Sequence, residues 1–163
     1  MNTTTTFIPA PADAEQHAEQ PDRLPIWVYG TLRPDFGNAR IWEGLAYAKY
    51  DGKSRIDNHK LVSNGGFPYC IPHEGSTTYG CLIVPSVDQY DYVLTSMDSL
   101  EGVPVHYTRE TVAVTCPDGI VMAWVYIPAH LSHVEGLSDV YLNDWTQHVR
   151  RRHTNLNDRW SID

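Results

Sequence analysis

Short apolar segments separated by turn residues run through most of the chain. Segments of this kind predict β-strands, and they lie at residues 25–32, 59–64, 67–71, 77–84, 106–116 and 120–127. The last two are joined by Pro117-Asp118-Gly119, which predicts a hairpin. Because strands outnumber helices and their connections are short, we expect an α+β fold: a small, curved, mainly antiparallel β-barrel with flanking helices.

Helices are predicted over residues 38–47, 88–101 and 139–151. The second is the best defined, because apolar side chains recur at helical spacing and both ends carry a signal. At its start, Ser86-Val87-Asp88-Gln89 matches a capping box, in which two otherwise unpaired N–H donors are satisfied reciprocally. At its end, Gly102 tolerates the left-handed conformation in which many helices terminate.

The chain is predicted to hold one domain with a tail at each end. Residues 1–23 are rich in Thr, Pro, Ala, Gln and Glu and have almost no large apolar side chains, so we expect a disordered N-terminal tail. Residues 24–153 form the predicted domain, which is long enough to bury a core, and residues 154–163 form a C-terminal tail.

The charge balance argues against a nucleic-acid partner. The formal net charge is −8, whereas phosphate binding needs a clustered cationic surface. The one basic run, Arg150-Arg151-Arg152, falls near the end of a predicted helix, where it complements the helix dipole in solvent.

Three cysteines, Cys70, Cys81 and Cys116, show no C-x-x-C spacing and do not suggest a disulfide framework. No segment approaches the roughly 18 apolar residues of a membrane span, and the N-terminus lacks a signal-peptide pattern. We therefore expect a cytoplasmic protein with no membrane partner; the sequence does not indicate its oligomeric state.

The first candidate site is the segment Tyr29-Gly30-Thr31-Leu32-Arg33, which follows the apolar run 26–28. A strand that breaks into Gly and a small hydroxyl residue leaves backbone N–H groups unpaired at its end. Such groups form a concave donor site for an anion or a polarised carbonyl. Taken alone, the pattern also fits a strand that simply enters a turn.

A carboxylate on the 88–101 helix is the second candidate. The apolar stripe centres on Tyr90, Leu94 and Met97, and Glu101 falls roughly 40° from that centre at 100° per residue. Burial and the negative end of the helix dipole both favour the protonated form and raise the pKa of this carboxyl. A carboxyl with a pKa near neutrality suits a general acid/base. The alternative is that the helix end frays and Glu101 turns into solvent.

Arg109 is the third candidate for the functional site. It shares a strand face with Tyr107 by the two-residue period, just after the 88–101 helix. It can pair with Asp98 or with a substrate carboxylate, or it can form an ordinary surface ion pair of well under about 1 kcal/mol.

Together these segments resemble the γ-glutamylcyclotransferase-like (AIG2-like) superfamily. The segment at 29–33, with Asn38 after it, resembles the "YGTLR…N" signature of that family, and Met97-Asp98-Ser99-Leu100-Glu101-Gly102 resembles its "LDxxEG". Tyr107-Thr108-Arg109 resembles "YxR", Phe67-Pro68 resembles "(F/Y)P", and Gly80-Cys81-Leu82 resembles "GxL". The resemblance covers about residues 25–128, with Met97 in place of the usual Leu.

The resemblance implies a compact β-barrel with a cavity at the end of the first strand. It implies that Glu101 is the catalytic glutamate and that Tyr29, Gly30, Thr31 and Leu32 form the substrate-binding loop. We add Arg33 and Tyr107 from the matched motifs, and Tyr126 from the end of an apolar strand, as further candidate substrate-binding residues. From its sequence alone, Tyr126 also fits a core tyrosine with a satisfied hydroxyl. The "YGTLR" form is closer to the γ-glutamylamine and bacterial branches than to the glutathione-type branch.

The expected reaction is an intramolecular cyclisation of a γ-glutamyl amide. The α-amino group of the substrate attacks its own γ-carbonyl and yields 5-oxoproline and a free amine. One carboxyl, Glu101, can take the first proton and return it to the leaving nitrogen, a contribution of roughly 10²–10⁴-fold. We expect neither a metal nor a cofactor.

Two other functions remain open at this point. One is a non-catalytic relative that binds a small γ-glutamyl or carboxylate ligand, and the other is a hydrolase or lyase acting on another amide. Glu101 favours an enzyme, because a binder of acidic ligands gains nothing from a buried carboxylate beside an anion site.

Other patterns have more ordinary explanations. His130 and His133 have i, i+3 spacing, but they follow Pro128 in a predicted loop and lack the H-E-x-x-H motif. No local Cys/His pattern supports a cysteine nucleophile. Asn64-Gly65-Gly66 is a tight turn, since no helix follows to complete a phosphate site.

Overall fold

The computed structural model describes residues 23–161. Its strands are β1 (Ile26–Val28), β2 (Ala46–Ser63), β3 (Pro68–Pro85), β4 (Tyr107–Cys116), β5 (Gly119–Pro128) and β6 (Ser138–Asp139). Its helices are α2 (Tyr90–Glu101) and α3 (Trp145–Ser161), with short 3₁₀ turns at η2 (Gly37–Ile41), η3 (Val87–Gln89), η4 (Leu131–Val134) and η5 (Tyr141–Asn143). The predicted N-terminal tail, apart from Arg23, lies outside the described residues.

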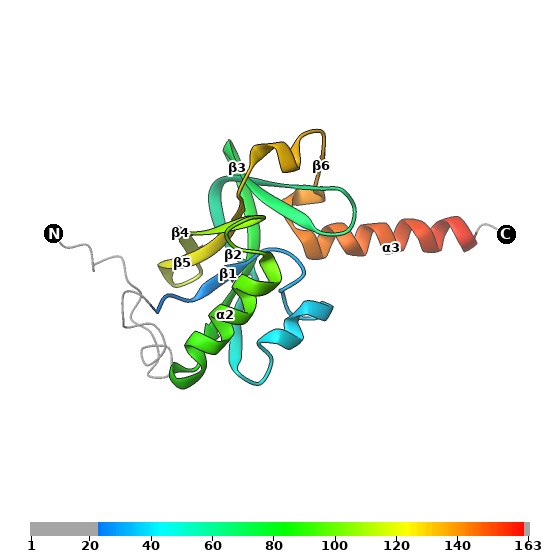
Figure 1. Ribbon diagram of the computed structural model, residues 1–163. Coiled ribbons are helices and arrows are strands. Elements are labelled where there is room, and N and C mark those ends of the chain that lie inside the picture. The colour runs from blue at the N-terminus through cyan, green and yellow to red at the C-terminus, as the bar shows by residue number, and fades with distance from the viewer. Residues whose placement is uncertain (1–22, 162–163) are drawn as a thin grey trace.

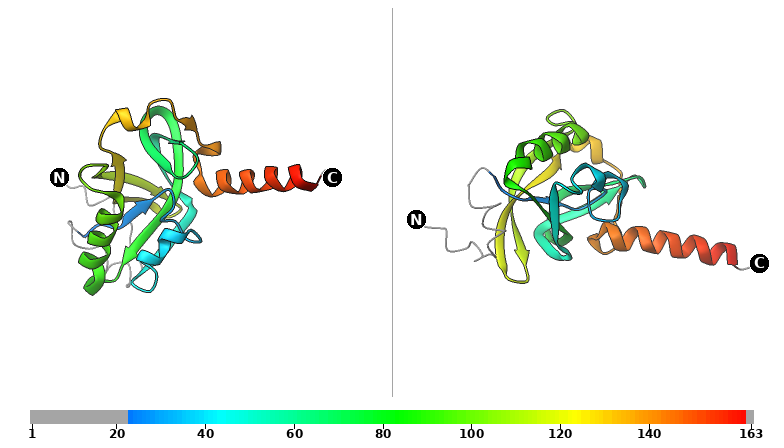
Figure 2. Two further views of the ribbon diagram at one scale, coloured as in Figure 1. Left: turned by 45° about the vertical axis from the view of Figure 1, so that its right-hand side comes forward. Right: turned by 90° about the horizontal axis from the view of Figure 1, so that it is seen from below.

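The strands close into a barrel. They follow the order β3-β1-β5-β4-β2-β6, and an additional β2–β3 pairing joins the first five into a ring, with β6 added to the edge of β2 (Figure 1). Every pairing is antiparallel except that of β1 with β5. The predicted α+β fold with a small, mainly antiparallel barrel is therefore confirmed. The helix α3 extends away from the barrel in all three views (Figures 1 and 2).

The strands β2 and β3 are longer than their apolar pattern predicted. The pattern indicated strand only from residue 59, whereas β2 begins at Ala46. Two register shifts interrupt its pairing with β3, between Lys49 and Ser54 and between Asp57 and His59. Bulges of this kind break the alternation of buried and exposed residues that identifies a strand in a sequence. The hairpin at residues 117–119 is confirmed, because Cys116 pairs with Gly119.

The helix boundaries differ from the prediction. The helix at 38–47 is reduced to the turn η2, and α3 begins and ends later than the predicted 139–151. The predicted capping box is wrong. Ser86 makes no capping hydrogen bond, and its hydroxyl donates instead to the carbonyl oxygen of Leu45 at 3.3 Å. An η3 turn therefore leads into α2 in place of a capped first turn.

Buried residues form two clusters, and β1 contributes to both. Ile26 and Val28 pack in the cluster that includes Val93 and Met97 of α2. Trp27, between them, packs in the second cluster. A three-residue strand that is buried on both faces is thus fixed in position, and the chain that leaves it at Tyr29 starts from a rigid point.

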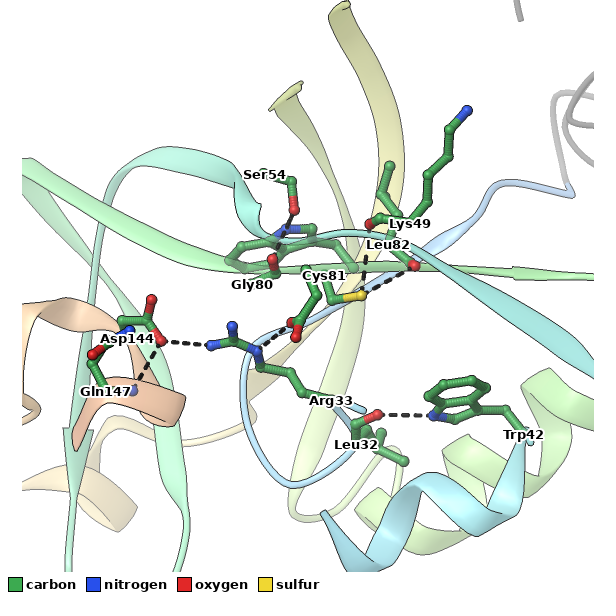
Figure 3. A network of polar contacts seen from close by, with 12 residues as sticks. Leu32, Arg33, Trp42, Lys49, Ser54, Gly80, Cys81, Leu82, Asp144 and Gln147 are labelled. Atoms are coloured by element: carbon green, nitrogen blue, oxygen red, sulfur yellow. Dashed lines mark hydrogen bonds and ion pairs between the residues drawn. The ribbon is translucent and has the colours of Figure 1, made fainter. Parts of the chain in front are cut away.

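The second cluster depends on a close approach at Gly80. The indole Nε1 of Trp27 donates to the hydroxyl of Ser54 at 3.1 Å, and that hydroxyl donates to the carbonyl oxygen of Gly80 at 2.9 Å (Figure 3). A Cβ atom added to Gly80 would lie 2.4 Å from the carbonyl oxygen of Val28 and 2.7 Å from the ring of Trp27. Only glycine fits there without displacing β1.

Substituting Gly80→Ala should therefore destabilise the protein by about 1–3 kcal/mol, the usual cost of overpacking a filled core. Urea denaturation of the wild type and the variant measures this. Gly37→Ala is the matched control, because nothing lies within 4 Å of the added Cβ. Equal stability of the two variants would contradict the close packing at Gly80.

Candidate active site

A cavity of about 340 Å³ opens where the chain leaves β1. It is lined by Trp27, Val28, Tyr29, Gly30, Thr31, Leu32, Asn38, Gly66, Phe67, Pro68, Leu100, Glu101, His106, Tyr107 and Tyr126. The structure thus brings together Glu101 and all the predicted substrate-binding residues except Arg33. Arg109, the third candidate from the sequence, does not line the cavity either.

Residues 29–32 of the loop after β1 line this cavity, and three of their backbone N–H groups are unpaired within the described chain. Those of Gly30, Thr31 and Leu32 donate to no other residue of the described chain. Other atoms of the loop hold it in place. Asn38 donates to the Thr31 hydroxyl at 2.8 Å, and Trp42 Nε1 donates to the carbonyl oxygen of Leu32 at 2.8 Å. Side chains outside the loop therefore hold it in place, while its own unpaired N–H groups stay available as hydrogen-bond donors.

Gly30 is required by the packing of this loop. A Cβ atom added there would lie 2.7 Å from Cγ of Pro68, at the start of β3. The absence of a side chain lets the loop lie against the proline ring, which places Pro68 in the cavity wall.

Arg33 does not face the cavity, so the position of its side chain does not support a substrate-binding role. It is only 1% exposed, and its guanidinium donates from Nε to Asp51 at 2.9 Å and from Nη1 to Asp144 at 2.8 Å (Figure 3). Asp144 also accepts from the backbone N–H of Gln147 at the start of α3. Arg33 therefore ties the loop after β1 to β2 and to the base of α3.

Glu101 is the last residue of α2, and it lines the cavity. Gly102 adopts the left-handed conformation with φ 73°, as the sequence predicted. The N–H of Gly102 bonds to the carbonyl of Ser99, and that of Val103 bonds to the carbonyl of Asp98, which together form a Schellman motif. The helix end is thus ordered and not frayed.

Burial raises the pKa of the Glu101 carboxyl to about 7. Among residues 23–154, whose side chains the structure describes, this carboxyl has no hydrogen-bond or ion-pair partner. Because no cation stabilises the charged form, desolvation alone sets the direction of the shift. The group can accept and release a proton near neutral pH.

The neighbouring carboxylate, Asp98, has the opposite environment. Arg109 donates to both of its oxygens, each at 3.0 Å, and the Tyr126 hydroxyl donates to one of them at 2.7 Å. Of the alternatives open for Arg109, the structure therefore contains the pair with Asp98. This pair is partly buried and bidentate, and it fastens the last turn of α2 to β4 and β5.

The three candidate tyrosines differ in what their hydroxyls do. That of Tyr29 donates to the carbonyl oxygen of Tyr126 at 2.7 Å, and that of Tyr126 is bound to Asp98. The hydroxyl of Tyr107 has no partner in the described part of the chain, and burial together with the Glu101 charge raises its pKa. Tyr107 is thus the candidate tyrosine with a hydroxyl available to a ligand.

His106 lines the cavity, although the sequence did not single it out. Its Nε2 lies 3.1 Å from the Tyr69 hydroxyl, and its ring stacks on that of His133 with centroids 5.1 Å apart. The only sequence signal was its position directly before Tyr107. Among the described residues no group of three or more His, Cys, Asp or Glu side chains is placed to hold a metal ion.

The three cysteines are buried, do not line the cavity and have a pKa raised by that burial. No helix in the described part of the chain has the length and apolar character needed to cross a membrane.

Comparison with known proteins gives consistent matches. The family model described as "Gamma-glutamyl cyclotransferase, AIG2-like" matches residues 26–147. The gamma-glutamylcyclotransferase family protein YtfP of Escherichia coli (strain K12) is 32% identical over 120 residues, covering 74% of this chain and 94% of that protein.

Solved structures agree on the fold. The crystal structure of an AIG2-like protein from Mus musculus has a TM-score of 0.59 at 20% identity and covers 75% of this chain and 87% of that chain. The solution structure of YtfP from Escherichia coli has a TM-score of 0.52 at 28% identity, with 75% and 96% covered. Because the family model spans most of the chain, this protein belongs to the γ-glutamyl cyclotransferase, AIG2-like family.

Proposed function

We propose that this protein is a γ-glutamyl cyclotransferase that converts a γ-glutamyl amide into 5-oxoproline and a free amine, with Glu101 as the general acid/base. The observation that carries this proposal is a partly buried carboxyl that has no partner among the described side chains and shares a cavity with unpaired backbone donors. Family membership supports the same class of reaction.

In this mechanism the N–H groups of Gly30, Thr31 and Leu32 bind the substrate carboxylate or the developing oxyanion. The cavity folds the γ-glutamyl group so that its amino nitrogen approaches its own γ-carbonyl carbon, which removes much of the entropic cost of ring closure.

Proton transfer falls to Glu101. Its carboxylate takes a proton from the attacking amine as the new C–N bond forms. The carboxyl then returns that proton to the leaving nitrogen as the old C–N bond breaks. No water is consumed and no covalent enzyme intermediate forms. We assign a hydrogen bond to the substrate to Tyr107, because its hydroxyl has no partner in the described chain and it lines the same cavity.

The substitution Glu101→Gln tests the acid/base role. It keeps the shape of the side chain but cannot exchange the proton, so we expect 5-oxoproline formation from γ-glutamyl amines to fall by roughly 10²–10⁴-fold. The assay also includes γ-glutamyl dipeptides and glutathione as substrates. Glu74→Gln, an exposed substitution on β3, is the control and should be unchanged.

Near-wild-type turnover by the Glu101→Gln variant would remove Glu101 from the mechanism. Release of glutamate in place of 5-oxoproline by the wild type would identify a hydrolase. Ligand binding without any product would identify a non-catalytic member of the family.

The pH dependence of stability provides a second test. The folded-state pKa of Glu101 is raised from 4.5 to about 7, so between these values the folded protein holds a proton that the unfolded chain has lost. Stability is therefore lost as pH rises through this window, by on the order of 3 kcal/mol in total. Urea denaturation at pH 5 and pH 8 should show that Glu101→Gln gains stability relative to the wild type at the higher pH. An equal difference at both pH values would mean that the carboxyl is not buried.

A further inference from the structure

One wall of the cavity is built from aromatic rings that contact one another. Phe67, His106 and Tyr107 line it, and Tyr69 lies behind them. The ring of Tyr69 lies 5.3 Å from that of Phe67 and stacks on that of Tyr107 at 5.5 Å, between centroids. His106 meets Tyr107 edge-on at 4.9 Å. These separations are those of interacting aromatic pairs, so the wall is packed and ordered.

Large apolar side chains at this cavity remain partly in water. Phe67 is 36% exposed and Leu100 is 43% exposed, although both line the cavity. They come from different elements, the segment before β3 and the last turn of α2. Exposed apolar surface at a pocket is a common mark of a binding site, because a ligand that covers it gains the free energy of burial.

No Lys or Arg side chain of the described residues lines the cavity. Glu101 is the one Asp, Glu, Lys or Arg side chain among its lining residues. The two arginines of the neighbouring segments, Arg33 and Arg109, are paired with carboxylates. A second negative group on a ligand would therefore lie near Glu101 without a counter-charge, which is unfavourable.

We propose that this wall, centred on Phe67 and His106, is a subsite for the amine part of the substrate and takes an uncharged amine that carries an aromatic ring. The proposal rests on the proposed function, in which the loop donors and Glu101 hold the γ-glutamyl part. The amine part then extends along the remaining wall, where a ring can pack on Phe67 and cover Leu100.

Three substrates separate the features of this subsite. γ-Glutamyl-2-phenylethylamide carries a ring, γ-glutamyl-phenylalanine carries the same ring with an added carboxylate, and γ-glutamyl-ethylamide carries neither. We expect kcat/KM for 5-oxoproline formation to be about tenfold or more higher for the first than for either other. A γ-glutamyl-phenylalanine rate equal to or above that of the phenylethylamide would overturn the proposal, as would an equal rate with the ethylamide.

A fourth substrate, γ-glutamyl-4-aminobutylamide, tests whether the rings recognise a cation instead. Preference for this compound over the phenylethylamide would also overturn the proposal. The expected result is a lower kcat/KM than for the ring-bearing amide.

Phe67→Ala locates the subsite. It should lower kcat/KM for the phenylethylamide by about tenfold and leave the ethylamide within about twofold. A tenfold loss is about 1.4 kcal/mol, which is within the range of one aromatic contact. Tyr92→Ala is the control, because Tyr92 is a 63% exposed aromatic residue on α2 that does not line the cavity. Equal losses on both substrates would place the effect of Phe67 outside the amine subsite.

Binding without turnover keeps this test separate from the proposed function. Glutaryl-2-phenylethylamide lacks the attacking amino group and cannot cyclise, so its affinity can be measured by calorimetry against glutaryl-phenylalanine and glutaryl-ethylamide. The same ranking with no 5-oxoproline from any substrate would support the subsite and remove the cyclotransferase activity. Turnover without this ranking would support the activity and remove the subsite.

Discussion

The last turn of α2 is held on the barrel by one carboxylate, Asp98, and the geometry of the cavity depends on that contact. Arg109 and Tyr126 are direct neighbours across the β4–β5 pair, and both bind Asp98. Glu101 follows one helical turn later and is therefore placed by the same contact. The pairing also has an electrostatic effect. Because Arg109 is bound to Asp98, it does not stabilise the charged form of Glu101, and burial is free to raise the pKa of that carboxyl.

Arg33 anchors the loop after β1 through ion pairs, as Arg109 anchors the last turn of α2. It is buried between Asp51 and Asp144 and so joins three distant segments of the chain: the loop after β1, the bulged part of β2 and the residue that precedes α3. The pair with Asp144 is buried, whereas Asp51 is 36% exposed, so the contact with Asp144 is the one less screened by solvent. Arg33 and Arg109 thus stabilise the positions of the loop and the helix around the cavity. The residues that line the cavity form no ion pair with the described side chains.

Local patterns were enough to predict much of the framework. Helical periodicity placed Glu101 on the core side of its helix, Gly102 marked the helix end, and Pro117-Asp118-Gly119 gave the hairpin. The first half of β2 could not be predicted, because its bulges remove the alternation on which strand prediction relies. The partners of Arg33 lie 18 and 111 residues away, and no local signal links them. His106 was missed for the same reason, since the cavity wall to which it belongs is assembled only when β3, β4 and η4 come together.

The absence of Lys and Arg from the described residues that line the cavity links the proposed chemistry to the proposed specificity. A carboxyl that must both accept and release a proton near neutral pH works poorly beside a fixed positive charge, which would hold it ionised. In the proposed mechanism the anion is bound by backbone N–H groups, whose partial charges attract an oxyanion or carboxylate without adding a full charge. In the described part of the chain, this arrangement provides no Lys or Arg side chain to pair with a second carboxylate at the other end of the cavity. The same constraint that keeps Glu101 protonatable thus leaves packing against Phe67 and its aromatic neighbours as the means of recognising the amine.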